Sequence, residues 1–297
     1  MTEPVTAPID VVVVLVHWNQ ARALERTLQM FRDQDAVIQF VAVDNGSRAD
    51  EIEFLRKLAA DADDLELIET GANLGFGPGA NIGLTWWLAE TTATWAIVAP
   101  HDAAPGAGCV RTLLNECSQR PLAGLACADV GDGHVPFIDP YFGGLTRTAR
   151  QDTGWEPADY PHGTLMMIRR ACAEEIGLFD ERYFSYNEEA DLGRRATAAG
   201  WEIGLVHDAT VTNTHLGTSV AAVDYLQQRN TLLMVREMSG RYHAFIRLCI
   251  SLGHILSGLM SPSTRPLIFD AVARLAGIRD FLLGRFGPPP PAMYLRP

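Results

Sequence analysis

The strongest constraint on the fold is an apolar run near the start of the chain. Asp10–His17 has the sequence DVVVVLVH, an almost unbroken series of β-branched residues without the polar alternation of a half-exposed strand. Such a run predicts a strand buried on both faces, as in a parallel sheet. It is too short to span a bilayer and no basic segment precedes it, so we interpret it as a strand and not as a signal sequence.

Helical and strand-like patterns alternate after this run. Apolar residues recur at helical spacing in segments 24–31 and 52–58, and a third helix is expected through 86–89. Three further strands are predicted at Ile38–Val43, Leu65–Glu69 and Trp95–Ala99. This order predicts an α/β fold with a doubly wound, Rossmann-like sheet.

The pattern loosens after residue 105. The stretch from Val130 to Pro161 is rich in Gly, Pro and Asp, and we expect it to form loops over the site. A strand at Leu165–Ile168 and a helix at Glu188–Gly200 are predicted beyond it.

Polar motifs follow the carboxyl ends of the predicted strands, where doubly wound sheets bind their ligands. They are HWN at His17–Asn19, DNGS at Asp44–Ser47, GANLGFG at Gly71–Gly77 and PHDAAP at Pro100–Pro105. A carboxylate at Asp44 suits a hydrogen bond from a ribose or a base. The same DNGS segment is also good turn chemistry, so a helix cap or an Asx-turn is an equal alternative.

A glycine cluster at Gly75, Gly77 and Gly79 does not form a dinucleotide fingerprint, because the final glycine would fall on Ile82 and the segment follows the third strand. Close approach of this backbone to a diphosphate is still expected, with side-chain contacts from Asn73 and Asn81.

Asp102 and His101 follow the fourth predicted strand. A carboxylate in this place suits a hard divalent cation, Mg²⁺ or Mn²⁺, but one carboxylate needs partners. His215, in the segment THLGTS, is the candidate ligand. Taken separately, a helix cap for Asp102 and a surface position for His215 are the more ordinary readings.

The strongest local signal is FDERYFSYNEEADL at Phe179–Leu192, with Glu188, Glu189 and Asp191 close together after an aromatic turn. Acidic residues in a first helical turn are favoured by the helix dipole, which is the ordinary interpretation. The functional one is that a carboxylate held beside aromatic rings has a raised pKa and removes a proton from an acceptor hydroxyl.

In this order, these motifs resemble glycosyltransferase family 2, the inverting transferases of the GT-A fold, and within it the rhamnosyltransferase-like branch. The segments that carry the resemblance are VVVLVHWN with VDNGS, ANLGFGPGANIG, APHDAAP, and the stretch from GTLMMIRR to WEI with HLGTS after it. The likeness extends from residue 10 to about 235 and includes QQRN at Gln227–Asn230.

The resemblance implies a role for each matching residue. Asp44 would bind the base, and the donor pocket would include His17, Asn19, Asn73, Gly75, Gly79, Asn81 and His101. Asp102 and His215 would hold the cation, while Tyr186 and Asp191 would contact the acceptor. The base would be Glu189, where the family has an aspartate; because glutamate is one methylene longer, Glu188 is kept as the alternative.

Charge divides the chain. The net charge is −12, which disfavours a nucleic-acid partner. Residues 240–297 nevertheless carry seven Arg and two acidic residues, so residues 1–239 hold a charge of −17. We expect a GT-A catalytic domain over 1–239, with a nucleotide-sugar half to about residue 105 and an acceptor half from about 106, followed by a helical tail.

The tail has an amphipathic pattern. Apolar residues recur at helical spacing from Phe245 to Leu259 and again from Leu267 to Gly287, with Arg274, Arg279 and Arg285 among them. Helices of this kind lie on anionic membranes or pack on a partner subunit, and both alternatives stay open. The charge-free segment Leu248–Thr264 falls short of the about 20 residues needed to cross a bilayer.

We therefore predict an enzyme that moves one sugar from a nucleotide-diphosphate donor, dTDP-rhamnose or a UDP-sugar, to a glycan, lipid-linked or cell-wall acceptor. Transfer to a small natural product and a non-catalytic sugar-nucleotide scaffold are the alternatives. The five cysteines are scattered without a CxxC pair, which is typical of reduced thiols in the cytoplasm. The expected place is the cytoplasm, with peripheral contact at the inner face of the cell membrane.

Overall fold

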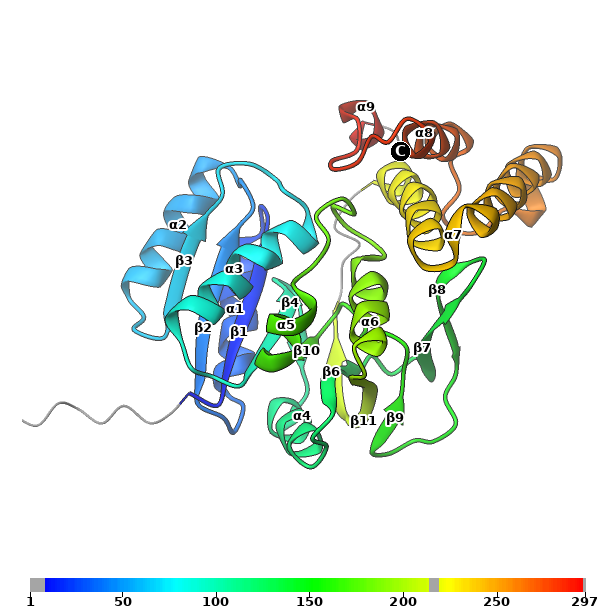
Figure 1. Ribbon diagram of the computed structural model, residues 1–297. Helices are drawn as coiled ribbons and strands as arrows, with labels where there is room; N and C mark the ends of the chain where they lie inside the picture. The colour runs from blue at the N-terminus through cyan, green and yellow to red at the C-terminus, as the bar shows by residue number, and fades with distance from the viewer. Residues whose placement is uncertain (1–8, 214–218, 296–297) are drawn as a thin grey trace, which may run out of the picture.

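The computed structural model describes residues 9–213 and 219–295 (Figure 1). The strands are β1 (Val11–His17), β2 (Ile38–Asp44), β3 (Leu65–Glu69), β4 (Trp95–Pro100), β5 (Ala104–Pro105), β6 (Ala123–Asp129), β7 (His134–Asp139), β8 (Gly143–Thr148), β9 (Trp155–Pro157), β10 (Met166–Arg169) and β11 (Glu202–Thr212). The helices are α1 (Ala21–Arg32), α2 (Ala49–Ala60), α3 (Phe76–Glu90), α4 (Cys109–Ser118), α5 (Arg170–Ile176), α6 (Glu188–Ala198), α7 (Val220–Met260), the short 3-10 turn η1 (Pro262–Thr264), α8 (Ala271–Leu282) and α9 (Pro291–Tyr294).

The main sheet has the strand order β3-β2-β1-β4-β10-β6-β11-β5, and β9 pairs with β11 beside this path. β1 pairs in parallel with both β2 and β4, and every one of its residues is buried. One face of β1 packs with Leu24, Leu28 and Phe31 of α1, and the other packs with Leu84 and Trp87 of α3. The predicted α/β sheet, with its first strand covered on both faces, is confirmed.

The second half of the sheet is mixed. β10 runs antiparallel to β4 and β6, whereas β11 is parallel to β6. The loops expected over Val130–Pro161 were a wrong prediction in part: β7 and β8 form a two-stranded hairpin, and β9 pairs with β11. β9 owes its pairing to β11, which is distant in sequence, whereas β7 and β8 are neighbours in the chain; a local pattern rich in Gly and Pro reveals neither pairing.

Helices α7, α8 and α9 cover the end of the molecule beyond α6 (Figure 1). α7 is interrupted at Gly240, where φ is 85° and ψ is 177°, so the expected start of the tail coincides with a kink in this helix. The part before the kink is mostly buried, whereas Phe245, Leu256 and Leu259 after it are more than half exposed. By length and composition alone, α7 is the one helix among the described residues apolar enough to cross a membrane.

Candidate active site

A cavity of about 410 Å³ opens at the carboxyl ends of β1 and β4. His17 and Trp18 line it from the end of β1, and His101 and Asp102 from the turn after β4. From the other half of the chain it is lined by His162, Gly163, Thr164, Phe184, Ser185, Tyr186, Glu188 and Glu189. The cavity thus lies where the sheet topology places ligands in this fold class.

His17 is held in one orientation. Its Nε2 accepts the backbone N–H of Gln20 at 2.9 Å, so the ring proton lies on Nδ1 and is donated to Asp44 Oδ1 at 3.0 Å. Burial alone would raise the pKa of Asp44, but the hydrogen bonds from His17 and from Ser47 outweigh it and hold that pKa below its usual value. Asp44 is fully buried and does not line the cavity, so its direct contacts orient His17.

The loop between β3 and α3 is held in place by the side chain of Asn45. The Asn45 side chain donates to the carbonyl of Gly75 at 2.7 Å and accepts the N–H of Leu74 at 3.2 Å, while Asn73 accepts the N–H of Gly75 at 3.0 Å. Gly75 has a φ of 95°, and a Cβ there would overlap the carbonyl oxygen of Phe184. The two halves of the cavity therefore meet backbone to backbone at a position that only glycine fills without strain.

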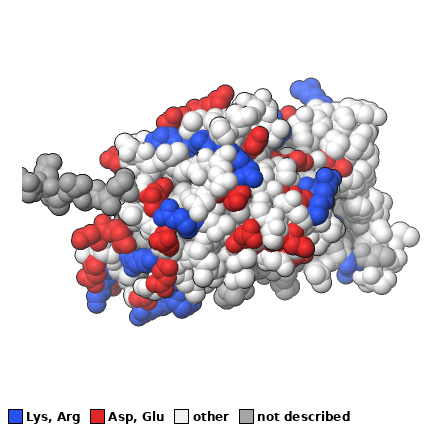
Figure 2. All heavy atoms as spheres, turned by 90° about the horizontal axis from the view of Figure 1, so that it is seen from below, with Lys and Arg blue, Asp and Glu red and all other residues white. Residues whose placement is uncertain are grey.

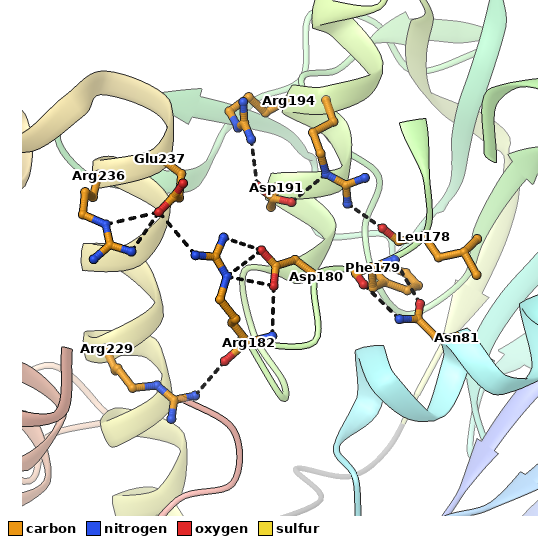
Figure 3. A network of polar contacts seen from close by, with 11 residues as sticks. Asn81, Leu178, Phe179, Asp180, Arg182, Asp191, Arg194, Arg229, Arg236 and Glu237 are labelled. Carbon is orange, nitrogen blue, oxygen red and sulfur yellow. Dashed lines mark hydrogen bonds and ion pairs between the residues drawn. The ribbon is translucent and has the colours of Figure 1, made fainter. Parts of the chain in front are cut away.

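Besides Asp44, four predicted donor or acceptor residues lie outside the cavity lining. Because α3 begins at Phe76, Gly79 and Asn81 are inside a helix; Gly79 packs on Asn45, and the Asn81 amide both donates to and accepts from the backbone of Phe179 at 2.9 Å. Asn19 accepts the N–H of Arg48 at 2.8 Å. Asp191 is buried and ion-paired with Arg194 and Arg195 (Figure 3).

The segment before α6 has a strained backbone. Phe184, Tyr186 and Asn187 have φ values of 67°, 71° and 72°, a region that residues other than glycine rarely occupy. The Asn230 side chain of α7 holds this segment by donating to the carbonyls of Tyr183, Ser185 and Tyr186 at 2.7–2.8 Å. Asn230 therefore positions the segment before α6. The QQRN motif contains this residue, but its contacts could not be read from the sequence.

A second set of bonds anchors the segment from both sides. Ser185 accepts the N–H of Phe76 at 3.0 Å, which joins it to the start of α3. Arg182 pairs with Asp180 at 2.6 Å and reaches Glu237 of α7 at 3.4 Å, as Figure 3 shows. The backbone strain is thus sustained by α3 and α7 together.

Glu188 and Glu189 follow this segment as the first two residues of α6. Glu188 is 1% exposed, and its Oε2 has no hydrogen-bond partner; burial and the neighbouring Glu189 raise its pKa well above the usual value. Burial also raises the pKa of Glu189 to about 7. Glu189 lies against Gly163, where any Cβ would overlap its carboxylate oxygen. The pair has the proton affinity of a general base working near neutral pH.

The candidate metal ligands are only partly described. Asp102 and His101 line the same cavity, and the His101 ring lies edge-on to His17 with centroids 5.4 Å apart. His215 lies outside the described residues. Within residues 9–213 and 219–295, no group of three or more His, Cys, Asp and Glu side chains is placed to hold a metal ion.

Several lining residues were not predicted. Trp18 belongs to the HWN motif and lines the cavity, and it is 37% exposed. His162, Gly163 and Thr164 precede β10, and Gly163 and Thr164 open the GTLMMIRR segment, yet none of the three was among the predicted site residues. The tertiary fold places them in the same cavity as Glu188 and Glu189 of α6.

Comparison with known proteins agrees with this geometry. The model of "Glycosyl transferase family 2" matches residues 12–177, and that of "Glycosyltransferase like family 2" matches residues 145–232. N-acetylglucosaminyl-diphospho-decaprenol L-rhamnosyltransferase of Mycobacterium tuberculosis is 31% identical over 178 residues, which cover 50% of this chain and 58% of that protein. The low-salt glycan biosynthesis hexosyltransferase Agl10 of Haloferax volcanii is 24% identical over 75% of each chain.

Among solved structures, the mannosyltransferase PcManGT from Pyrobaculum calidifontis in complex with GDP-Man and Mn²⁺ matches with a TM-score of 0.60. The match covers 94% of this chain and 89% of that one at 15% identity, so it establishes the GT-A fold alone. The first family model covers more than half of the chain and includes the cavity residues at the ends of β1 and β4, and the second includes Glu188 and Glu189. The chain belongs to glycosyltransferase family 2.

Proposed function

We propose that this chain transfers one sugar from a nucleotide-diphosphate donor to an acceptor hydroxyl, with inversion at the anomeric carbon. The observation that carries the proposal is the place of Glu189, in the wall of the cavity that Asp102 and His17 line, with a pKa raised by burial to about 7. A carboxylate of this kind is deprotonated in a large fraction of molecules at neutral pH and still binds a proton well.

The proposed reaction is a single displacement. The acceptor oxygen attacks the anomeric carbon from the face opposite the diphosphate, Glu189 takes the hydroxyl proton, and the bond from carbon to the diphosphate oxygen breaks. The nucleoside diphosphate leaves with the bonding electrons, so no covalent enzyme intermediate forms. His17 is fixed by Asp44 and Gln20, which engage both of its ring nitrogens, so it contributes a rigid wall to the donor cavity and no free polar atom.

Asp102 and His101 would hold a divalent cation in this scheme. They offer one carboxylate and one imidazole to the same cavity, a set that suits Mn²⁺ or Mg²⁺ once diphosphate oxygens complete the coordination. The cation would neutralise charge on the departing diphosphate. The Pyrobaculum mannosyltransferase holds Mn²⁺ with its nucleotide sugar, which supports this assignment.

The finer identities of the substrates follow the relatives' names. The mycobacterial relative is named as a rhamnosyltransferase acting on a diphospho-decaprenol-linked sugar, and the Haloferax relative as a hexosyltransferase of glycan biosynthesis. We propose dTDP-rhamnose or a UDP-sugar as the donor. A lipid-linked or cell-wall glycan is proposed as the acceptor.

Membrane contact at the inner face of the cell membrane belongs to the same proposal. Phe245 and Leu256 of α7 are 63% and 60% exposed, and Val272 of α8 is 52% exposed. Figure 2 shows acidic groups concentrated over the half of the molecule that bears the N-terminus and few toward the opposite end. Replacing Phe245 and Leu256 by Ser should weaken sedimentation with anionic liposomes. Equal sedimentation of the wild type and this variant would exclude the surface as the site of membrane contact.

The test of the function is nucleotide binding followed by product analysis. Nucleoside diphosphates should raise the melting temperature more with Mn²⁺ than without it, because a ligand that binds the folded state stabilises it. Asp102→Asn should remove the Mn²⁺-dependent part, while Asp50→Asn, on exposed α2, should keep it. Transfer with retained anomeric configuration, or no stabilisation by any nucleotide, would overturn the proposal.

A further inference from the structure

A second cavity adjoins the first on the other side of Glu189. It has a volume of about 480 Å³ and lies between β8, the start of α6, and helices α7 and α8. His162, Gly163, Tyr186 and Glu189 line both cavities. A molecule seated in the second cavity therefore reaches the carboxylate that we assign as the base, from the side away from Asp102.

Both basic and acidic side chains line the second cavity. Arg247, His254 and Arg274 line it, and its carboxylates are Glu189 at the shared wall and Asp224. Asp224 is already engaged, because Oδ2 lies 2.8 Å from Arg274 Nε and 2.7 Å from the backbone N–H of Asp270 that it accepts. Arg274 is thus neutralised by the protein itself.

Among residues 9–213 and 219–295, Arg247 has no such partner. Its Nε and Nη1 are buried without a hydrogen bond, and its guanidinium lies over the ring of Phe142, 5.2 Å from the centroid. Burial, and then the nearby Arg274, lower the pKa of Arg247 to about 10, so the group is still charged at neutral pH. The Arg247 side chain is partly buried, and an anion from outside would supply the acceptor that its two buried N–H groups lack.

We propose that Arg247, with Arg274 beside it, binds a phosphate or diphosphate group of the acceptor, so that the attached sugar presents its hydroxyl to Glu189. This inference rests on the proposed transfer function. The planar guanidinium offers parallel N–H donors that match phosphate oxygens, which suits the unpaired Nε and Nη1 atoms. The proposed acceptor is therefore a phosphorylated glycoside, whose phosphate binds in a site separate from that of the donor diphosphate.

The surroundings favour a phosphate that links the sugar to a hydrocarbon chain. The same two helices that supply Arg247 and Arg274 expose apolar side chains to solvent, among them Phe245 and Leu252 of α7 and Leu275 of α8. A lipid attached to the phosphate would leave the cavity beside this apolar surface. A soluble sugar phosphate would use the same arginines without that surface.

Calorimetry with a short alkyl diphosphate tests the site directly. The full chain is first saturated with a nucleoside diphosphate and Mn²⁺, so that the donor cavity is filled. The wild type should then bind the alkyl diphosphate, and Arg247→Gln should bind it about tenfold or more weakly, since hydrogen bonds to charged groups contribute that much. Arg241→Gln removes one charge from an exposed position of the same helix and should bind like the wild type.

Stability separates a binding role from a structural one. If Arg247 is kept for its ligand, Arg247→Gln should have the same melting temperature as the wild type or a higher one without ligand. A lowered melting temperature, equal binding by wild type and Arg247→Gln, or no binding by the wild type would overturn the proposal.

Binding of inorganic diphosphate distinguishes a lipid-linked acceptor from a soluble phosphorylated one. Weaker binding than the alkyl compound supports a lipid-linked acceptor, and equal binding supports a soluble phosphorylated one. Because these measurements need no sugar transfer, failure of this site and failure of the transfer function give separate results.

Discussion

The buried polar groups around the two cavities that meet at Glu189 differ in whether the protein supplies hydrogen-bond partners for them. On the donor side, Asp44 is fully buried but accepts bonds from His17 and Ser47, and its pKa lies below the usual value. Glu188, in the wall of the same cavity, and Arg247, in the wall of the second cavity, have buried polar atoms for which the described residues supply no hydrogen-bond partner. Asp44 and Glu188 are buried to a similar degree, so the difference between them lies in the hydrogen bonds that the chain itself supplies.

A third buried carboxylate shows that pairing, and not burial, decides the outcome. Glu156 of β9 is 2% exposed, yet the backbone of Arg150 and the side chains of Arg147 and His207 overcome the effect of burial and lower its pKa to about 2. The His17–Asp44 pair on the donor side is therefore complete before substrate arrives. The acceptor side keeps charges whose partners come with the substrate, and a general base needs the proton affinity that this arrangement gives.

The largest expected effect comes from replacing Glu189, the proposed base at the wall between the two cavities. Glu189→Gln should lower the transfer rate by about 10²- to 10⁴-fold, the usual contribution of general base catalysis. In the wild type, kcat/KM should fall below about pH 7, since protonation of Glu189, with its pKa raised to about 7, removes the base. A pH profile measured with saturating Mn²⁺ checks the midpoint.

Glu188→Gln is the control for this prediction. The raised pKa of Glu189 comes from its own burial, so its midpoint should stay near 7 in this variant. Should Glu188→Gln lose the activity while Glu189→Gln retains it, the base is Glu188.

A smaller effect is expected when the strained segment is released. Asn230→Ala removes the donors to three carbonyls of residues 183–186, so the positive-φ backbone before Glu188 should relax. We expect kcat to fall about 100-fold, because small displacements of a catalytic group have effects of this size, with little change in donor affinity. Steady-state kinetics measures both quantities, and Asn115→Ala, at an exposed position on α4, is the neutral control. A raised KM for the donor with unchanged kcat would contradict this role.

The donor half could be predicted from sequence because its signals are local. Strands β1 to β4 fall within one residue of the predicted ranges, since continuous apolar runs between turn residues define a buried strand without knowledge of its neighbours. His17 and Asp102 line the cavity because each follows such a strand directly. Asn81 was predicted to contact the sugar donor. It lies instead inside α3, which begins at Phe76, and its side chain is hydrogen-bonded to Phe179.

The acceptor half could not be predicted to the same degree because its contacts join distant segments. Arg247 comes beside Tyr186 only because α7 continues past the kink at Gly240 and packs over β8 and α6. Asp191 seemed a candidate by proximity to Glu189 in sequence, yet helical geometry places Arg194 and Arg195 within reach of it at i+3 and i+4. Such pairings follow from the tertiary fold and leave no periodic pattern.

The smallest of the three effects is expected on the donor side, where Asp44 is hydrogen-bonded to His17. Asp44→Asn keeps an acceptor oxygen but brings an amide N–H₂ toward donors at His17 Nδ1 or Ser47 N, so one buried hydrogen bond is lost. We expect unfolding free energy to fall by about 1–3 kcal/mol and donor affinity by about tenfold, because His17 loses its fixed orientation. Denaturant unfolding and nucleotide titration measure these changes, with Asp63→Asn, in an exposed turn, as the control. The acceptor side should be unaffected, so the affinity for an alkyl diphosphate at Arg247 should stay at the wild-type value. If both affinities fall together, the two cavities are coupled and the division between a preformed donor side and a substrate-completed acceptor side is wrong.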